Sequence, residues 1–444
     1  MIPSAAWLEL GEGFHDVVEA ASPPQLVPRF LNHRAAAEIG LEDIEAHCGR
    51  LEPIEGSLPE PLALRYHGHQ FRMYNPDLGD GRGFLLAQLR AGGRLLDLGT
   101  KGSGTTPYSR GGDGRLTLKG ALREVLAAEL LEARGVPTCR ILSVFETGEE
   151  LVRYDEPSPT RSALMVRLSW SHVRIGTFQR LAYRGQPELL ERLVGYCCRN
   201  LVDEAHDVPS FLEAVRDRLA DCAGAWMAAG YVHGVLNTDN LNVTGESFDY
   251  GPFRWLVRCE PGFTAAYFDS VGLYAFGRQA GQVEWALHRL AEALAPLYDK
   301  AALKRILKPF PQLYRRSVEH HFARRLGVED RGTAELLAAA TSALAMTGTP
   351  FDQLFHDWRG GLASAQRALE GPYADVWRSP AARRFRAALE DHAPTVEPDH
   401  PHLVRPTPVG LPIESIEALW TQVDVGDNWA AFERMIDDIR ATPG

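Results

Sequence analysis

Short apolar runs and one long helical repeat dominate the first 170 residues. One segment, LTLKGALREVLAAELLEAR (116–134), has apolar residues at spacings of three and four and predicts a helix, which Gly135 and Pro137 end. Around it, five runs rich in aliphatic residues predict strands. They are FLLAQLR (84–90), RLLDLGTK (94–101), CRILSVFET (139–147), ELVRY (150–154) and ALMVRLSW (163–170).

The pattern becomes helical after residue 185. Amphipathic helices are expected at 188–205, 211–230, 281–299, 301–327 and 334–346, with short strands near 254–258. Residues 62–83 are rich in Gly, Asp and aromatic residues and are expected to form loops. The segment before them is interrupted by prolines and has one helical stretch, FLNHRAAAEIGL, while the segment after 372 is punctuated by Pro and His and ends in two short helical segments.

This order predicts an α+β chain with a sheet-rich unit followed by a larger helical unit. We expect an N-terminal extension at 1–60, a small sheet-based lobe at 61–180, a helical lobe at 181–371 and a C-terminal extension at 372–444.

Composition narrows the class of protein. The chain has 444 residues, 45% of them hydrophobic, and a net charge of −11, which argues against a general nucleic-acid or anionic-membrane binder. No apolar run is long enough for a membrane span, and no signal or transit peptide is visible. The six cysteines form no C-x-x-C pair, so zinc is not expected. These features predict a reduced, cytoplasmic protein.

The most informative stretch is YVHGVLNTDNLNVTGESFDYG (231–251). Kinase-type phosphoryl transfer uses H-R-D-x-x-x-x-N followed by D-F-G, in which the first Asp accepts a proton and the Asn and second Asp hold Mg²⁺. His233, Asn240 and Asp249 stand at matching positions, but Val235 replaces the proton acceptor. The segment is therefore that of an inactive kinase, or of an enzyme that does different chemistry with the same nucleotide.

Asp239 is the only acid between His233 and Asn240. It is a candidate proton acceptor, or it only caps the short turn formed by TDN. We expect His233 to brace the loop.

Other residues fit a nucleotide triphosphate site. Lys101 ends a predicted strand and Glu124 lies on the following helix, in the order by which a kinase places an ammonium group on phosphates. The loops LGDGR and GGDGR combine flexible backbone with an arginine, although each also suits a simple hairpin turn. Two further arginines at the end of a strand suit phosphate neutralisation. These candidates are Gly79, Gly81, Arg82, Asp113, Gly114, Arg167 and Arg174.

Taken together, these segments resemble the selenoprotein O family, the kinase-like protein adenylyltransferases. The likeness extends over nearly the whole chain. The matching segments are YHGHQF…LGDGR (66–82), KGSGTTPYSRGGDGR (101–115), LREVLAAE (122–129), VRLSWSHVRIG (166–176), HGVLNTDN…FDYGPF (233–253), FGRQ…EWALHRLAEAL (276–294) and GDNWAAFERMIDDI (426–439).

The resemblance implies a two-lobed, protein-kinase-like fold that binds ATP in reverse and transfers AMP, or UMP, to Ser, Thr or Tyr hydroxyls of proteins. Asp239 would be the proton acceptor, Asn240 and Asp249 would bind Mg²⁺ (Mn²⁺ being an alternative), and Glu124 would pair with Lys101. The residues implied to hold ATP, or UTP, are Gly79, Gly81, Arg82, Lys101, Asp113, Gly114, Arg167, Arg174 and Asp249. No nucleic-acid or membrane partner is expected.

Two other functions stay open at the level of sequence. A kinase would transfer the γ-phosphate, although loss of a general base typically costs about 10²–10⁴ in rate. A silent nucleotide-binding scaffold would need no metal ligands. The chain also departs from the family pattern: Arg72 stands in place of Gly, Arg278 stands in place of Asn, and the family's C-terminal cysteine is absent.

Overall fold

The computed structural model describes residues 1–154 and 156–443. Within them, one nine-stranded antiparallel sheet has the order β2-β4-β7-β8-β11-β10-β3, with β1 paired to β7 and β9 to β11. Its strands are β1 (Ile2–Ser4), β2 (His15–Val17), β3 (Val27–Leu31), β4 (Leu62–Leu64), β7 (Leu85–Ala91), β8 (Arg94–Lys101), β9 (Leu116–Thr117), β10 (Arg140–Leu151) and β11 (Thr160–Ser169). Two smaller sheets pair β5 (Gly68–Gln70) with β6 (Met73–Asn75) and β12 (Tyr231–Val232) with β13 (Arg254–Trp255).

The central strands lie where the apolar runs predict them, but the edges differ. The run at 139–147 and the first two residues of the run at 150–154 form the single strand β10, which ends at Leu151 and whose pairing with β11 shifts register between Glu146 and Glu150. Residues 62–83, expected as loops, contain β4, β5 and β6, and the first 31 residues supply β1 to β3. Such short strands carry little periodicity, because three to five residues are too few to show a clear alternation of apolar and polar positions.

The predicted long helix is α2 (Leu118–Ala133), and it packs against β10 and β11. The Thr117 side chain caps its start by accepting a hydrogen bond from the Gly120 amide, which satisfies an otherwise free backbone donor. Its apolar face is buried with the inner face of the sheet, and Glu124, on the same helix, is only 2% exposed. The helix therefore directs one carboxylate to the interior.

Helices fill the rest of the chain. They are α1 (His33–Ile39), α3 (Ile175–Tyr183), α4 (Pro187–Asn200), α5 (Val208–Ala229), α6 (Gln279–Leu294), α7 (Lys300–Leu307), α8 (Phe310–Leu326), α9 (Thr333–Thr347), α10 (Phe351–Trp358), α11 (Ala365–Glu370), α12 (Ala374–Arg378), α13 (Arg383–Leu389), α14 (Ile413–Gly426) and α15 (Ala430–Arg440). The predicted helix 301–327 is two helices that meet at Lys308 and Pro309, because proline has no backbone N–H to continue the hydrogen bonds of a helix.

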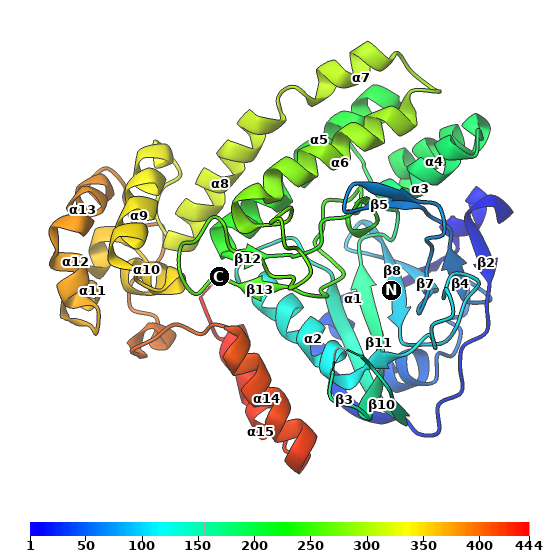
Figure 1. Cartoon of the computed structure of the whole chain (residues 1–444), viewed down its shortest axis with the longest axis horizontal. Coiled ribbons are helices and arrows are strands. Elements are labelled where there is room, and N and C mark those ends of the chain that lie inside the picture. The colour runs from blue at the N-terminus through cyan, green and yellow to red at the C-terminus, as the bar shows by residue number, and fades with distance from the viewer. Residues whose placement is uncertain (155, 444) are drawn as a thin grey trace.

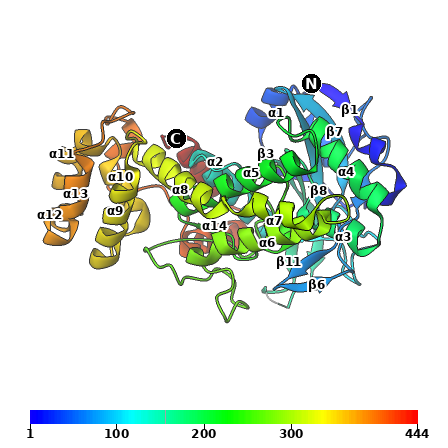
Figure 2. The ribbon, with the colours of Figure 1, turned by 90° about the horizontal axis from the view of Figure 1, so that it is seen from above.

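The helices α5 to α8 lie beside the sheet, and α9 to α13 form the end farthest from it (Figures 1 and 2). The last helix, α15, returns to pack on α2, where Arg440 donates to both carboxylate oxygens of Glu129 at 2.7 Å. This α+β arrangement is compatible with two lobes. No helix in the described part of the chain is long and apolar enough to cross a membrane.

Candidate functional site

A polar cavity of about 750 Å³ lies between the sheet and the loop that follows β12. Its lining includes seven glycines, seven basic residues and four acidic residues, although the whole chain carries a net charge of −11. A locally basic, glycine-lined cavity in an acidic protein is suited to a polyanion. The basic residues are Arg82, Lys101, Arg110, Arg115, Arg153, Arg167 and Arg174, and the acidic ones are Asp80, Asp113, Asp239 and Asp249.

Asp249 is the point where the cavity's deepest cations meet. Its Oδ1 lies 2.6 Å from Arg167 Nη1 and 3.2 Å from Lys101 Nζ, and its Oδ2 lies 3.9 Å from Arg174 Nη2. Burial opposes ionisation, but the charges of Arg167, Lys101 and Arg174 outweigh it and hold the pKa of Asp249 well below its usual value. Asp249 therefore stays ionised, with three cations around it.

Lys101 ends β8 and also hydrogen-bonds Glu124 of α2. Both side chains are almost fully buried, so each needs the other's charge. The structure thus brings together the strand lysine and the helix glutamate that sequence order suggested, and it fixes the ammonium group at the cavity wall.

Arg174 is held by a residue that sequence reasoning did not select. Its Nη1 lies 3.3 Å from Asp80 Oδ1, and its guanidinium stacks 4.1 Å from the centre of the Tyr66 ring. Asp80 Oδ2 in turn accepts a hydrogen bond from the Leu64 amide at 3.1 Å. Asp80 lies inside the LGDGR loop, so the motif could have identified Asp80 as a site residue from the sequence.

The two glycine-containing loops line the cavity with backbone. At Gly79 a Cβ would lie 2.3 Å from the Tyr108 ring, so a side chain there would push Tyr108 away. Gly81, Arg82, Asp113 and Gly114 also line the cavity. Asp113 lies at the more exposed rim, where Arg153 donates to both of its oxygens at 2.8 and 3.0 Å.

Asp239 is buried at the cavity, and its Oδ1 has no hydrogen-bond partner within the described residues. Burial raises its pKa to about 6. It belongs to the short helix η4 (Thr238–Asn240), whose Thr238 hydroxyl accepts from the His69 amide at 2.7 Å. The β5–β6 hairpin therefore positions a carboxyl group whose pKa lies just below physiological pH, where the carboxylate form predominates.

Asn240 lines the cavity next to Asp239, and its Nδ2 donates to the Val235 carbonyl at 3.0 Å. This bond uses the amide nitrogen and leaves the side-chain oxygen for a cation. The described residues contain no cluster of three or more His, Cys, Asp or Glu side chains able to hold a metal ion. Asn240 and Asp249 are oxygen donors of the kind Mg²⁺ prefers, and they suit an ion that takes further ligands from phosphates.

His233 and Val235, the other residues of the HGV…DYG segment considered above, differ in their position relative to the cavity. His233 Nε2 lies 3.0 Å from the Phe248 carbonyl, and burial lowers the pKa of His233, as expected for a residue that braces the loop. Val235 lines the cavity. Arg72 instead stacks on Trp285 and Arg278 donates to the Val271 carbonyl, so neither departure from the family pattern intrudes on the cavity.

Fold and cavity together define an α+β protein with a basic, glycine-lined cavity suited to a polyanion. Residues 3–440 match the family described as protein adenylyltransferase SelO. The chain is 39% identical to the protein nucleotidyltransferase YdiU of Synechococcus elongatus, over 97% of this chain and 93% of that protein. It is 40% identical to the proteins of the same name from Trichodesmium erythraeum (97% and 96%) and Gloeobacter violaceus (98% and 94%). The chain belongs to the protein adenylyltransferase SelO family.

Proposed function

We propose that this protein transfers AMP from ATP to Ser, Thr or Tyr hydroxyl groups of other proteins and releases pyrophosphate; UTP, and hence UMP, is the alternative donor. Family membership supports the reaction class. The observation that carries the proposal is the pairing of Val235 with Asp239 in one cavity. The kinase base is missing, while another carboxyl group with a pKa of about 6 faces the same space.

The proposed fold is the two-lobed, kinase-like one, with lobes at 61–180 and 181–371 and extensions at 1–60 and 372–444. The cavity draws lining residues from both proposed lobes, as a nucleotide cleft does. The N-terminal extension docks on the first proposed lobe, since β1 pairs with β7. The C-terminal extension contacts both lobes, since α13 packs on α9 and α15 packs on α2.

The proposed orientation of ATP follows from where the cations lie. Lys101, Arg167 and Arg174 are each less than 10% exposed, so the most negative part of the nucleotide is favoured deep in the cavity. Gly79, Gly81, Arg82, Asp113 and Gly114 would then contact the rest of the nucleotide along the two loops. In this reversed arrangement the α-phosphorus is left for the acceptor.

In the proposed reaction, the acceptor hydroxyl oxygen bonds to the α-phosphorus as the bond from that phosphorus to pyrophosphate breaks. Asp239 takes the hydroxyl proton, and Lys101, Arg167 and Arg174 stabilise the negative charge of the departing pyrophosphate. Asn240 and Asp249 would hold Mg²⁺, or Mn²⁺, which supplies further charge neutralisation to the phosphates. Glu124 keeps Lys101 in place.

Label position tests the proposal. The protein is incubated with Mg²⁺, a lysate as acceptor, and ATP labelled on either the α- or the γ-phosphate. We expect acid-stable α-label on protein. Retention of γ-label would instead indicate a kinase, and ATP binding with neither label retained would indicate a silent scaffold.

A further inference from the structure

His172 lines the cavity with one ring nitrogen engaged and the other unused. Its Nδ1 lies 3.2 Å from Asp97 Oδ2, and its backbone amide donates to the same oxygen at 2.8 Å. The side chain is only 4% exposed, and Nε2 has no hydrogen-bond partner within the described residues. A buried polar atom without a partner is costly, so such an atom at a cavity wall is available to a ligand that enters the cavity.

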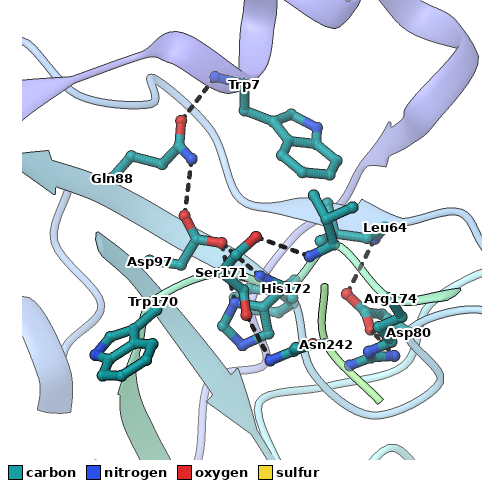
Figure 3. Close-up of polar contacts among 12 residues, drawn as sticks. Trp7, Leu64, Asp80, Gln88, Asp97, Trp170, Ser171, His172, Arg174 and Asn242 are labelled. Carbon is teal, nitrogen blue, oxygen red and sulfur yellow. Dashed lines mark hydrogen bonds and ion pairs between the residues drawn. The ribbon is translucent and has the colours of Figure 1, made fainter. Parts of the chain in front are cut away.

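The carboxylate behind His172 is itself rigidly held. Gln88 Nε2 donates to Asp97 Oδ1 at 2.7 Å, and Gln88 Oε1 accepts from the Trp7 amide at 2.7 Å. Figure 3 shows this chain from Trp7 through Gln88 and Asp97 to His172. An aspartate that accepts from Nδ1–H fixes the orientation of the ring, and Nε2 donates to an anion when that nitrogen carries a proton as well.

Strand register places that nitrogen beside the phosphate-binding cations. Asp97, Gly99 and Lys101 alternate onto one face of β8, and Gly99 pairs directly with Arg167 of β11. A Cβ at Gly99 would lie 2.3 Å from His172 Nε2. The ring nitrogen therefore fills the space of the absent side chain, on the same face as Lys101 and Arg167.

We infer that His172 is a further phosphate-contacting residue, whose Nε2–H donates to the phosphate groups beyond the α-phosphate, with Asp97 as its positioning residue. This inference rests on the proposed function, because it assigns His172 to the pyrophosphate part of the same nucleotide. In this arrangement each ring N–H faces an acceptor: Nδ1–H the Asp97 carboxylate and Nε2–H a phosphate oxygen.

The test uses the full chain and measures the Kd of MgATP and of AMP. His172→Asn keeps a donor near the Nδ1 position but removes the Nε2 atom, so we expect the Kd of ATP to rise about 10-fold or more while that of AMP changes less than about 2-fold. His172→Gln places an amide near the Nε2 position and should recover most of the affinity. His320→Asn is the matched control, because His320 pairs with Asp330 at 2.7 Å on the surface, outside the cavity.

A double-mutant cycle tests the role of Asp97. Asp97→Asn should weaken ATP binding in the wild-type background but add little in the His172→Asn background, which a merely structural role would not produce. Gly99→Ala, which displaces the ring, serves as a second variant if His172→Asn does not fold; its ATP affinity should fall while its AMP affinity is kept.

Unchanged ATP affinity in His172→Asn, or in Gly99→Ala where that variant replaces it, would overturn the inference. Equal losses for ATP and AMP would also overturn it, because the contact would then be to the nucleoside. Either result leaves the proposed function standing if the wild-type protein still transfers α-label. A wild-type protein that does not bind ATP would remove both proposals.

Discussion

Asp239 and Asp249 lie in one cavity, yet their surroundings shift their pKa values in opposite directions. Burial raises the pKa of Asp239 to about 6, while Arg167, Lys101 and Arg174 outweigh burial and lower that of Asp249. Such divergence is how an active site assigns a proton acceptor and a permanently charged group to the same residue type. At the residue scale, the two carboxylates therefore predict different behaviour on substitution.

We predict that AMP transfer increases with pH through about 6 and then levels off. Below that value Asp239 is protonated and cannot accept the hydroxyl proton; above it the carboxylate is available. The measurement is the initial rate of α-label transfer from pH 5 to 8 at saturating MgATP.

Asp239→Asn should lower that rate by about 10²–10⁴ and remove its dependence on pH, with ATP affinity largely intact. Asp203→Asn, at an exposed carboxylate elsewhere, is the control. A variant at position 239 with the wild-type rate would show that another group accepts the proton.

Asp249→Asn should abolish transfer and make ATP binding independent of Mg²⁺. The substitution removes an anionic metal ligand, so added metal no longer offsets the charge of the phosphates. Calorimetric titration of ATP, with Mg²⁺ and with EDTA, measures this dependence for the wild type and the variant. Persistence of a large Mg²⁺ effect in Asp249→Asn would place the metal on other ligands.

At the scale of elements, α2 is held from both sides. Its inner face carries Glu124 to Lys101, and its outer face carries Glu129 to Arg440 of α15. Glu129 is 4% exposed and also accepts from Asn32 at 3.2 Å. The C-terminal helix α15 lies outside the cavity. By binding Glu129 it helps to hold α2, which carries the Glu124 carboxylate that pairs with Lys101.

Arg440→Ala should destabilise the protein by about 1–3 kcal/mol, because it leaves the buried Glu129 carboxylate without its bidentate partner. Arg405→Ala is the matched control: Arg405 pairs with Asp438 near the same helix, but both side chains are more than a third exposed. That exposed pair should contribute about 0–1 kcal/mol. Urea denaturation measures both, and equal effects would argue against a special role for the Arg440 contact.

At the scale of the whole molecule, the cavity joins parts of the chain that are distant in sequence. Its lining runs from Tyr66 to Pro252, and it collects positive charge within a protein whose net charge is −11. A ligand that bridges these parts stabilises the folded state by mass action.

MgATP should therefore raise the free energy of unfolding by about 2.7 kcal/mol at a concentration 100 times its Kd. A thermal shift measures the effect, with AMP as the comparison ligand, and EDTA should reduce it. At the same multiple of its own Kd, AMP should give an equal shift by mass action. The two ligands are therefore compared by the concentration that gives the same thermal shift, which should be far lower for MgATP than for AMP.

Much of this molecule follows from the sequence by itself. The pattern of apolar residues located β8, β11 and α2, because long buried elements have a periodicity that short segments lack. The motifs located Lys101, Glu124, Asp239, Asn240 and Asp249, because phosphate and metal chemistry restricts residue type and order. The family followed from those motifs taken jointly, and the comparison confirmed it.

Only the tertiary structure decided the rest. Strands β1 to β6 are three to five residues long, which is too short to show a clear alternation of apolar and polar residues. Asp97 looked like an ordinary strand residue until folding placed it against His172. Sequence fixes which groups are available, whereas burial and neighbouring charge fix their pKa values and partners, and those depend on contacts between residues up to hundreds of positions apart.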